Sequence, residues 1–246
     1  LRALRKQGVS VQMCVLHKER EEDWIETVEK GRCSHLLNRI RFYWERAVIF
    51  LHNHFNRSQL FRVSIANTGT DISRLPCVRE ADVIHLHWIN QGFLSLNDIK
   101  QLAALGKPIV WTMHDMWSYT GVCHYASDCQ YVHQMCGSCF YLDSHADKDL
   151  STQTYQKKQQ IYKKADISFV GCSNWIAALA KKSGLLCGKR VVDIPNPIDT
   201  KLFRPSDKSK CRKDLSLPQD KRLILFGALN VTDERKGGNY LLKALP

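Results

Sequence analysis

The sequence has few of the features that mark membrane-spanning, disordered or fibrous proteins. Its apolar runs are short, as at residues 47–51, and none approaches the roughly 18 residues that cross a bilayer. Hydrophobic residues make up 44% of the chain and charged residues 24%, which excludes disordered, collagen-like and low-complexity proteins. There is no initiator methionine and no stretch with the pattern of a secretory signal. We therefore expect a globular chain, truncated at both ends, from a cytoplasmic protein.

Acidic residues are scarce relative to basic ones. The net charge is +12 at pH 7, and residues 151–246 alone carry 19 lysines and arginines against 8 acidic residues. A chain this basic attracts phosphate groups or an anionic membrane surface. Four lysines are either part of such a surface or a solvated helix face: Lys157, Lys158, Lys163 and Lys164. No recognition helix, RNA-binding aromatic pair or finger repeat is present, so we expect no nucleic-acid partner.

Strand-like and helix-like segments alternate from residue 80 onward. Ser173 stands where a helix N-cap belongs. The alternation predicts an α/β fold with a Rossmann-like parallel sheet flanked by helices, interrupted by a cysteine-rich insertion after residue 115. Ligands of such sheets bind beyond the carboxyl ends of the strands. The predicted strands are 81–88, 108–113, 167–172 and 191–195, and the predicted helices are 94–105, 152–165 and 175–182.

Two further segments flank this pattern. Residues 32–57 predict a helix with a broad apolar face and arginines beside it, among them Arg39, Arg46 and Arg57. This helix either covers the sheet or lies at a membrane interface, where the arginines meet lipid phosphates. Around residues 205–222 the composition becomes polar and charged, and a strand at 223–226 and a helix from 238 are predicted after it. We therefore predict a domain at 1–205 and the start of a second at 206–246.

Polar side chains gather where two neighbouring strands end. His85 and His87 lie on the same face of the first strand, because side chains alternate along a strand. His114 and Asp115 directly follow the second strand. Any one of these histidines alone would be read as a buried, hydrogen-bonded residue, but three at one sheet edge favour a ligand cleft. His114 beside Asp115 is suited to accept a proton or to donate a hydrogen bond.

A second candidate site is a loop near the end of the chain. The predicted strand is followed by Gly227, and Arg235 and Lys236 precede two glycines where a helix begins. Backbone N–H groups at a helix start, together with two cations, suit a diphosphate. On spacing alone, an exposed charged turn is an equal alternative.

Four of the ten cysteines are clustered, with the spacing C-x5-C-x6-C-x2-C. Cys136 and Cys139 form the tight knuckle that tetrahedral zinc sites use, and Cys123 and Cys129 would complete four thiolates. Because no secretory signal accompanies them, we interpret the cluster as a closed, structural zinc site. Disulfides, free thiols and an iron–sulfur cluster are the alternatives.

Together these motifs resemble glycosyltransferase family 4. The resemblance covers nearly the whole chain, strongly from residue 80. It implies a retaining, nucleotide-sugar-dependent enzyme of the GT-B fold, in which two Rossmann-like domains face each other across a cleft, and this chain would be the N-terminal half. The cysteine-rich insertion resembles a branch found in bacterial capsule and exopolysaccharide clusters. The matching segments are residues 82–88, 112–115, 172–175, 194–199, 203–205 and 235–237.

The resemblance also implies roles for the matching residues. His114 would lie near the donor sugar as the catalytic residue that orients its hydroxyls, and His85, His87 and Asp115 would line the cleft.

The resemblance also implies residues that neutralise the negative charge of the donor diphosphate. Arg235 and Lys236 would neutralise the diphosphate, so that no catalytic metal is expected. Ala228 departs from the pattern, since many members have a phosphate-binding arginine there. We expect the family's first glycine-rich loop and its donor-binding glutamate pair to lie outside these residues, so that the chain by itself is inactive.

The resemblance therefore predicts a hexosyltransferase that moves a sugar from a nucleotide diphosphate-sugar to a glycan or lipid-linked acceptor in bacterial capsule or exopolysaccharide biosynthesis. It would act in the cytoplasm or peripherally on the inner face of the cell membrane, in contact with anionic lipid. The alternative from another class is a non-catalytic, zinc-stabilised, membrane-associated scaffold. That alternative predicts metal and lipid binding without nucleotide dependence.

Overall fold

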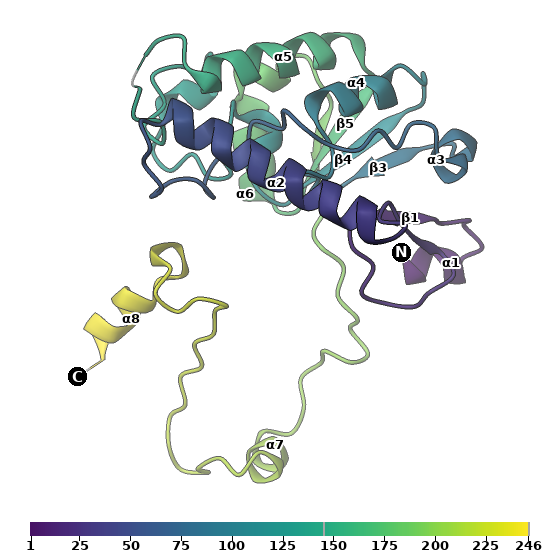
Figure 1. Cartoon of the computed structure of the whole chain (residues 1–246). Coiled ribbons are helices and arrows are strands. Elements are labelled where there is room, and N and C mark those ends of the chain that lie inside the picture. Colours follow the sequence, from purple (N-terminus) through teal and green to yellow (C-terminus); the bar gives the residue numbers. More distant parts are fainter. Residues whose placement is uncertain (145, 246) are drawn as a thin grey trace. The chain divides into compact units, whose positions relative to one another are not determined.

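The computed structural model describes residues 1–144 and 146–245 and divides the chain into two compact units, Leu1–Asn196 and Pro197–Pro246. The first unit contains a four-stranded, wholly parallel sheet, which confirms the predicted α/β arrangement (Figure 1). A separate parallel pair of strands precedes it in the chain. The sheet order is β3 (Ile84–Leu86), β4 (Ile109–Met113), β5 (Ile167–Gly171) and β6 (Val191–Asp193), and the separate pair is β1 (Met13–Val15) and β2 (Ile25–Thr27).

Helices separate the strands close to the predicted places. α4 (Leu96–Ala103), α5 (Leu150–Lys164) and α6 (Asn174–Lys182) connect successive strands of the sheet, and α4 and α5 lie side by side (Figure 1). Ser173 caps α6 as predicted, since its Oγ accepts a hydrogen bond from the Ile176 backbone N–H at 3.4 Å. The other helices are α1 (Arg2–Lys6), α2 (Arg32–His52), α3 (Pro76–Glu80), α7 (Lys208–Asp214), α8 (Gly238–Ala244) and the 3₁₀ turns η1 (Trp117–Tyr119), η2 (Gln130–His133), η3 (Gly184–Leu186) and η4 (Glu234–Lys236).

The core lies around β4, which has a strand on each side. Trp111 of β4 stacks on Phe169 of β5, with ring centroids 6.0 Å apart, and both side chains are buried. Gly171 ends β5 where α6 packs against it: a Cβ at this position would lie 2.7 Å from the Ala177 backbone nitrogen. Only glycine therefore lets α6 approach the strand this closely.

Helix α2 buries Ile49 together with the polar residues Asn38, Glu45 and Arg46, whereas most of its large apolar side chains are exposed. Its broad apolar face is therefore not the side that packs on the core. Glu45 is buried and its Oε1 accepts the backbone N–H groups of Ile65 and Ala66 at 2.8 and 2.7 Å. Arg46 is also buried and donates to the carbonyl of Val63 at 2.9 Å, so it does not reach a lipid phosphate. The backbone of residues 63–66 belongs to no named strand, and α2 supplies partners for the N–H groups of Ile65 and Ala66 and for the carbonyl of Val63.

Lys158 is fully buried, so it belongs neither to a surface that attracts phosphates or lipid nor to a solvated helix face. Its side chain has 0% relative exposure, and Nζ donates to the carbonyl oxygens of Trp117, Thr120 and Gly121 at 2.5, 3.0 and 3.0 Å. Nζ also lies 3.4 Å from the centroid of the Trp117 indole ring. The inward-facing carbonyls of the segment after β4 need a donor, and Lys158 supplies it. Burial lowers the pKa of Lys158 to about 7.

The second unit contains α7, η4 and α8 but no strand among its described residues. The predicted strand at 223–226 is therefore wrong. A strand is stable only when it pairs with a neighbouring strand, and none of the described residues of this unit forms one. The segment is left unpaired, and Leu225 within it is 97% exposed. The helix expected from residue 238 is present as α8. The units divide between Asn196 and Pro197, and the domain ranges 1–205 and 206–246 stay a prediction.

Candidate functional site

Three histidines meet at the carboxyl edge of the parallel sheet. His85 lies within β3, His87 follows it, and His114 follows β4, whose residues pair with those of β3. His87 Nδ1 lies 3.0 Å from His114 Nε2, a hydrogen-bond distance, and the two rings are stacked with centroids 5.3 Å apart. The ring of His85 lies 4.3 Å from that of His87, and its Nε2 lies 2.8 Å from Thr112 Oγ1.

The surroundings of these rings favour the neutral imidazole. Burial, and then the nearby rings of His85 and His114, lower the pKa of His87 to about 4. Burial, followed by the effect of His114, also lowers the pKa of His85. At neutral pH both rings are therefore uncharged, and each can donate one hydrogen bond and accept another. Such rings suit a ligand rich in hydroxyl groups.

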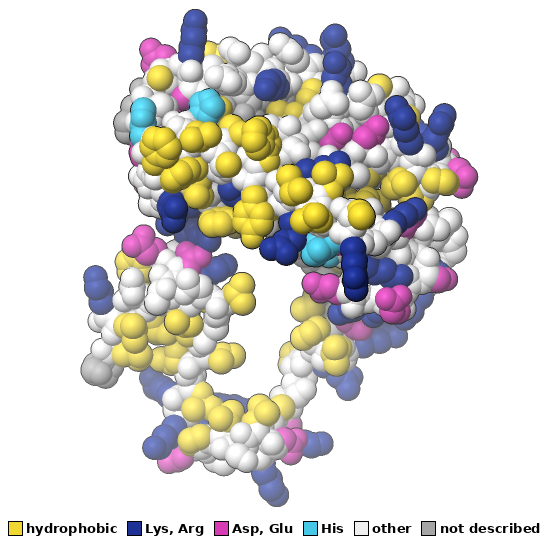
Figure 2. Space-filling view, in the orientation of Figure 1, with side chains coloured by type: hydrophobic (Ala, Val, Ile, Leu, Met, Phe, Trp, Pro, Cys, Tyr) yellow, Lys and Arg dark blue, Asp and Glu magenta, His cyan; other side chains and the backbone are white. Residues whose placement is uncertain are grey.

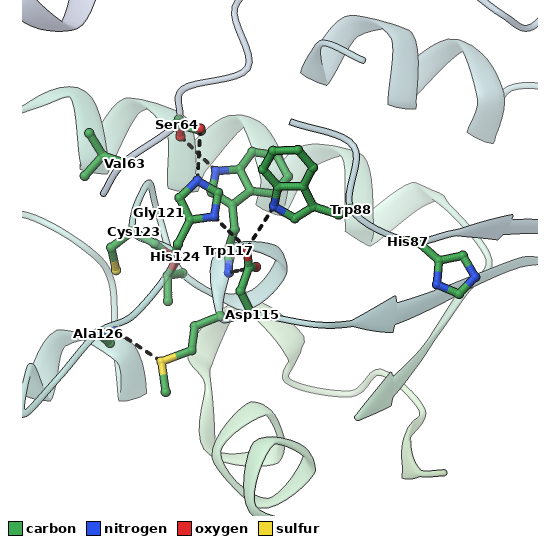
Figure 3. Close-up of polar contacts among 12 residues, drawn as sticks. Val63, Ser64, His87, Trp88, Asp115, Trp117, Gly121, Cys123, His124 and Ala126 are labelled. Atoms are coloured by element: carbon green, nitrogen blue, oxygen red, sulfur yellow. Dashed lines mark hydrogen bonds and ion pairs between the residues drawn. The ribbon is translucent and has the colours of Figure 1, made fainter. Parts of the chain in front are cut away.

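Asp115 is held by its neighbours rather than free (Figure 3). Its Oδ2 lies 2.6 Å from His124 Nδ1 and accepts the Trp88 indole N–H at 3.2 Å, while Oδ1 accepts the Trp117 backbone N–H at 2.9 Å. His124 Nε2 in turn lies 3.0 Å from Ser64 Oγ. This Asp–His–Ser order is that of hydrolase triads, but Ser64 is only 1% exposed, so its hydroxyl is closed to a substrate. Asp115 therefore positions Trp88 and the segment after β4.

A small pocket opens beside these residues. Its walls include His87, His114 and Asp115, together with Trp88 and Thr112. The structure thus brings the four sequence-predicted cleft residues to one edge of the sheet. Thr112 and Trp88 lie in segments that the sequence analysis singled out, but neither was predicted as a site residue. The position of Thr112, two residues before His114, would place both side chains on the same side of an extended chain.

His124 was missed as a partner of Asp115, since nothing in the spacing of the two residues indicates the contact. Its place in the fold depends on the segment after β4, where its backbone N–H donates to the Arg62 carbonyl at 3.1 Å.

Residues 1–202 match the sequence pattern of Glycosyltransferase Family 4. The chain belongs to this family. It is also 28% identical over 122 residues to WcaC of Escherichia coli (strain K12), whose name assigns it to colanic acid biosynthesis as a glycosyl transferase. That alignment covers 48% of this chain and 28% of WcaC, so the chain spans well under two thirds of this relative. No solved structure matches.

Family 4 membership agrees with the parallel sheet, which is consistent with the N-terminal half of a GT-B fold. Arg235 and Lys236 lie beyond the matched residues, in the second unit. Arg235 pairs with Asp233 through Nη2 and Oδ2 at 2.6 Å, and the side-chain hydrogen bond from Arg235 lowers the pKa of Asp233 to about 2. Lys236 ends η4 just before Gly237, whose φ of 77° gives the turn its left-handed residue.

The four clustered cysteines of this family 4 chain lie in the segment between β4 and α5. All four are free thiols, and Cys123 and Cys136 are buried. Burial raises the pKa of Cys123 to about 12 and also raises that of Cys136 and Cys139. In the described part of the chain, their sulfur atoms do not form a group of three within 4.8 Å of one another. The zinc site stays a prediction.

Proposed function

We propose that the protein containing this chain transfers a sugar from a nucleotide diphosphate-sugar to a glycan or lipid-linked acceptor in bacterial polysaccharide biosynthesis, with retention at the anomeric carbon. The observation that carries the proposal is the family match over residues 1–202. The name of WcaC supports a polysaccharide as the product. The neutral imidazoles of His85 and His87 support a sugar ligand, because they can exchange hydrogen bonds with hydroxyl groups.

In the proposed reaction, the acceptor oxygen attacks the anomeric carbon on the face from which the donor phosphate leaves. A carbon–oxygen bond to the acceptor forms, the bond to the phosphate breaks, and the acceptor proton passes to the departing phosphate. His114, steadied by the 3.0 Å contact to His87, orients the donor hydroxyls. Arg235 and Lys236 neutralise the charge that develops on the diphosphate.

The first test is transfer by the whole protein that contains this chain, carrying His114→Ala, measured with a panel of nucleotide sugars and a soluble glycan acceptor. Loss of one orienting hydrogen bond predicts a fall in kcat of about 100-fold or more, with the melting temperature unchanged. His52→Ala is the matched control, because His52 is an exposed histidine on α2 whose Nδ1 lies 2.9 Å from the Val48 carbonyl of its own helix. Transfer by His114→Ala at the control rate would remove His114 from the site. Absence of any nucleotide-sugar dependence in the unmodified protein would favour the scaffold instead.

We also propose that the outward apolar face of α2 contacts an anionic membrane, which presents the lipid-linked acceptor. Figure 2 shows a broad apolar patch over α2 with Lys and Arg side chains at its edges. Arg39 and Arg57 are exposed near this face, and their charge suits lipid phosphates. No helix among the described residues is both long and apolar enough to cross a bilayer. The exposed apolar residues of the helix are Leu36, Leu37, Ile40, Tyr43, Trp44 and Leu51.

Vesicle binding tests this contact. We expect the double variant Ile40→Glu/Trp44→Glu to lose most of its co-sedimentation with anionic vesicles, because it places two charges on the apolar face. Leu215→Glu is the control, since Leu215 is also an exposed apolar residue but lies in the second unit. Equal binding of the double variant and the control would show that α2 does not meet the membrane.

A further inference from the structure

Two histidines and a glutamate converge at the carboxyl ends of the separate strand pair. Glu29 Oε2 lies 2.8 Å from His17 Nδ1 and 3.2 Å from His35 Nδ1. Among the described residues, these three form the only group of three or more His, Cys, Asp or Glu whose ligand atoms all lie within 4.8 Å of one another. We propose that they bind a divalent transition-metal ion such as Zn²⁺ through two imidazole nitrogens and one carboxylate oxygen.

The strand topology explains why these residues meet. β1 and β2 are parallel, with Val15 opposite Thr27, so His17 and Glu29 each follow their strand by two residues at the same edge. The Thr27 hydroxyl ties the two loops together: it donates to the Leu16 carbonyl at 2.9 Å and accepts the Glu29 backbone N–H at 3.1 Å. α2 is the next element after β2, and its first turn adds His35.

A network behind the carboxylate holds it in place. Asn38, which is buried, donates from Nδ2 to Glu29 Oε1 at 3.1 Å and leaves Oε2 to the two histidines. Arg41 in turn donates to Asn38 Oδ1 at 3.0 Å and to Thr70 Oγ1 at 2.5 Å. Second partners of this kind orient the ligands of metal sites and strengthen their binding.

The ligand set indicates the class of ion. Imidazole nitrogen and carboxylate oxygen suit Zn²⁺, Co²⁺ and Ni²⁺, whereas Mg²⁺ and Ca²⁺ prefer oxygen ligands alone. Around a tetrahedral ion the ligand atoms lie about 3.3 Å apart, so the present separations need only small side-chain rotations. His17 and His35 are 56% and 54% exposed, which leaves these rotations unhindered and lets water complete the coordination, while the carboxylate is only 12% exposed.

The bound ion would join three segments: the loops after β1 and β2 and the first turn of α2. α2 has no side-chain cap at Gly31 and no acidic residue in its first turn, so Glu29 just before it is the carboxylate nearest in sequence to the helix start. The predicted consequence is a strand pair anchored to α2 in a metal-dependent way.

Cobalt and zinc titrations of the full chain test the proposal. We expect one equivalent of Co²⁺, displaced by Zn²⁺, in a shell of nitrogen and oxygen at about 2.0–2.1 Å by X-ray absorption. An ion held by the clustered thiolates would be separate from this one and would place sulfur at about 2.3 Å. Glu29→Gln, which keeps the shape of the side chain, and His35→Ala should each weaken binding at this shell about 100-fold or more. His52→Ala, at the other end of α2, should bind as the unmodified protein does.

Two outcomes would overturn the proposal. One is nitrogen and oxygen coordination that is as tight in His35→Ala and in His17→Ala as in the unmodified protein. The other is an ion bound only through sulfur. Circular dichroism of the metal-free variants checks that each one is folded. If an alanine variant is not folded, the metal affinity of Glu29→Gln decides the test.

Discussion

Replacement of Lys158 by methionine gives the sharpest test of the fold. Methionine keeps most of the apolar stem but removes the amino group, whose Nζ lies within hydrogen-bond distance of the carbonyls of Trp117, Thr120 and Gly121. A buried carbonyl that loses its donor costs about 1 kcal/mol or more. Near pH 8 the buried amine is neutral and has two N–H donors, so we expect the free energy of unfolding to fall by about 2 kcal/mol.

The loss should also depend on pH. Burial lowers the pKa of Lys158 from its ordinary 10.5 to about 7. Between these two values the unfolded chain holds a proton on this lysine and the folded chain does not. The contribution of Lys158 to the free energy of unfolding therefore rises with pH across this window, by up to about 1.4 kcal/mol per pH unit. Methionine cannot titrate, so the difference between Lys158→Met and the unmodified protein should widen from pH 7 towards pH 10.

Urea unfolding followed by tryptophan fluorescence at several pH values measures both effects. Lys157→Met is the matched control, because Lys157 is the preceding residue of the same helix and is exposed. It should change the free energy of unfolding by less than about 0.5 kcal/mol. The reasoning fails if Lys158→Met is as stable as this control, or if its deficit shrinks as the pH rises.

Two further predictions concern backbone packing and the thiol cluster. Gly171→Ala should lower the free energy of unfolding by about 1–3 kcal/mol, because its Cβ would lie 2.7 Å from the Ala177 backbone. Gly227→Ala is the control and should be neutral, because a Cβ there has no atom within 4 Å. Equal melting temperatures for the two variants would contradict the packing of α6 on β5. The predicted thiolate zinc site requires about one zinc bound through sulfur per chain and a lower melting temperature after chelation. Cys136→Ser should lose that zinc. Cys187→Ser should keep it, because Cys187 is exposed and lies outside the cluster. Metal-free protein that melts at the unchanged temperature would refute it.

Local patterns were sufficient for the parts of the fold that depend on neighbours in sequence. The strand leading to His85 and the strand before His114 could be predicted from apolar runs, and Ser173 from the preference of serine for the helix start. Because parallel strands end at one edge of a sheet, the meeting of His85, His87 and His114 also followed from the sequence. The motifs at these strand ends were enough to indicate the family.

Other predictions were wrong because burial depends on what a segment packs against. The composition of α2 predicts an apolar contact with the sheet, but the unpaired backbone at Ile65 and Ala66 needs polar partners, and Glu45 supplies them from the inward face. Residues 223–226 have the composition of a strand and no neighbour to pair with in the described part of their unit.

The sequence by itself determined the α/β class, the sheet edge that carries the histidines and the family. Only the tertiary structure decided which side of α2 is buried, that Lys158 donates to three interior carbonyls, and that Asp115 is bound to His124 and Trp88. It also brought His17 and Glu29 together with His35. The physical reason is the range of the interactions: periodicity and capping act over a few residues, whereas a buried polar group is satisfied by whichever partner the folded chain places beside it.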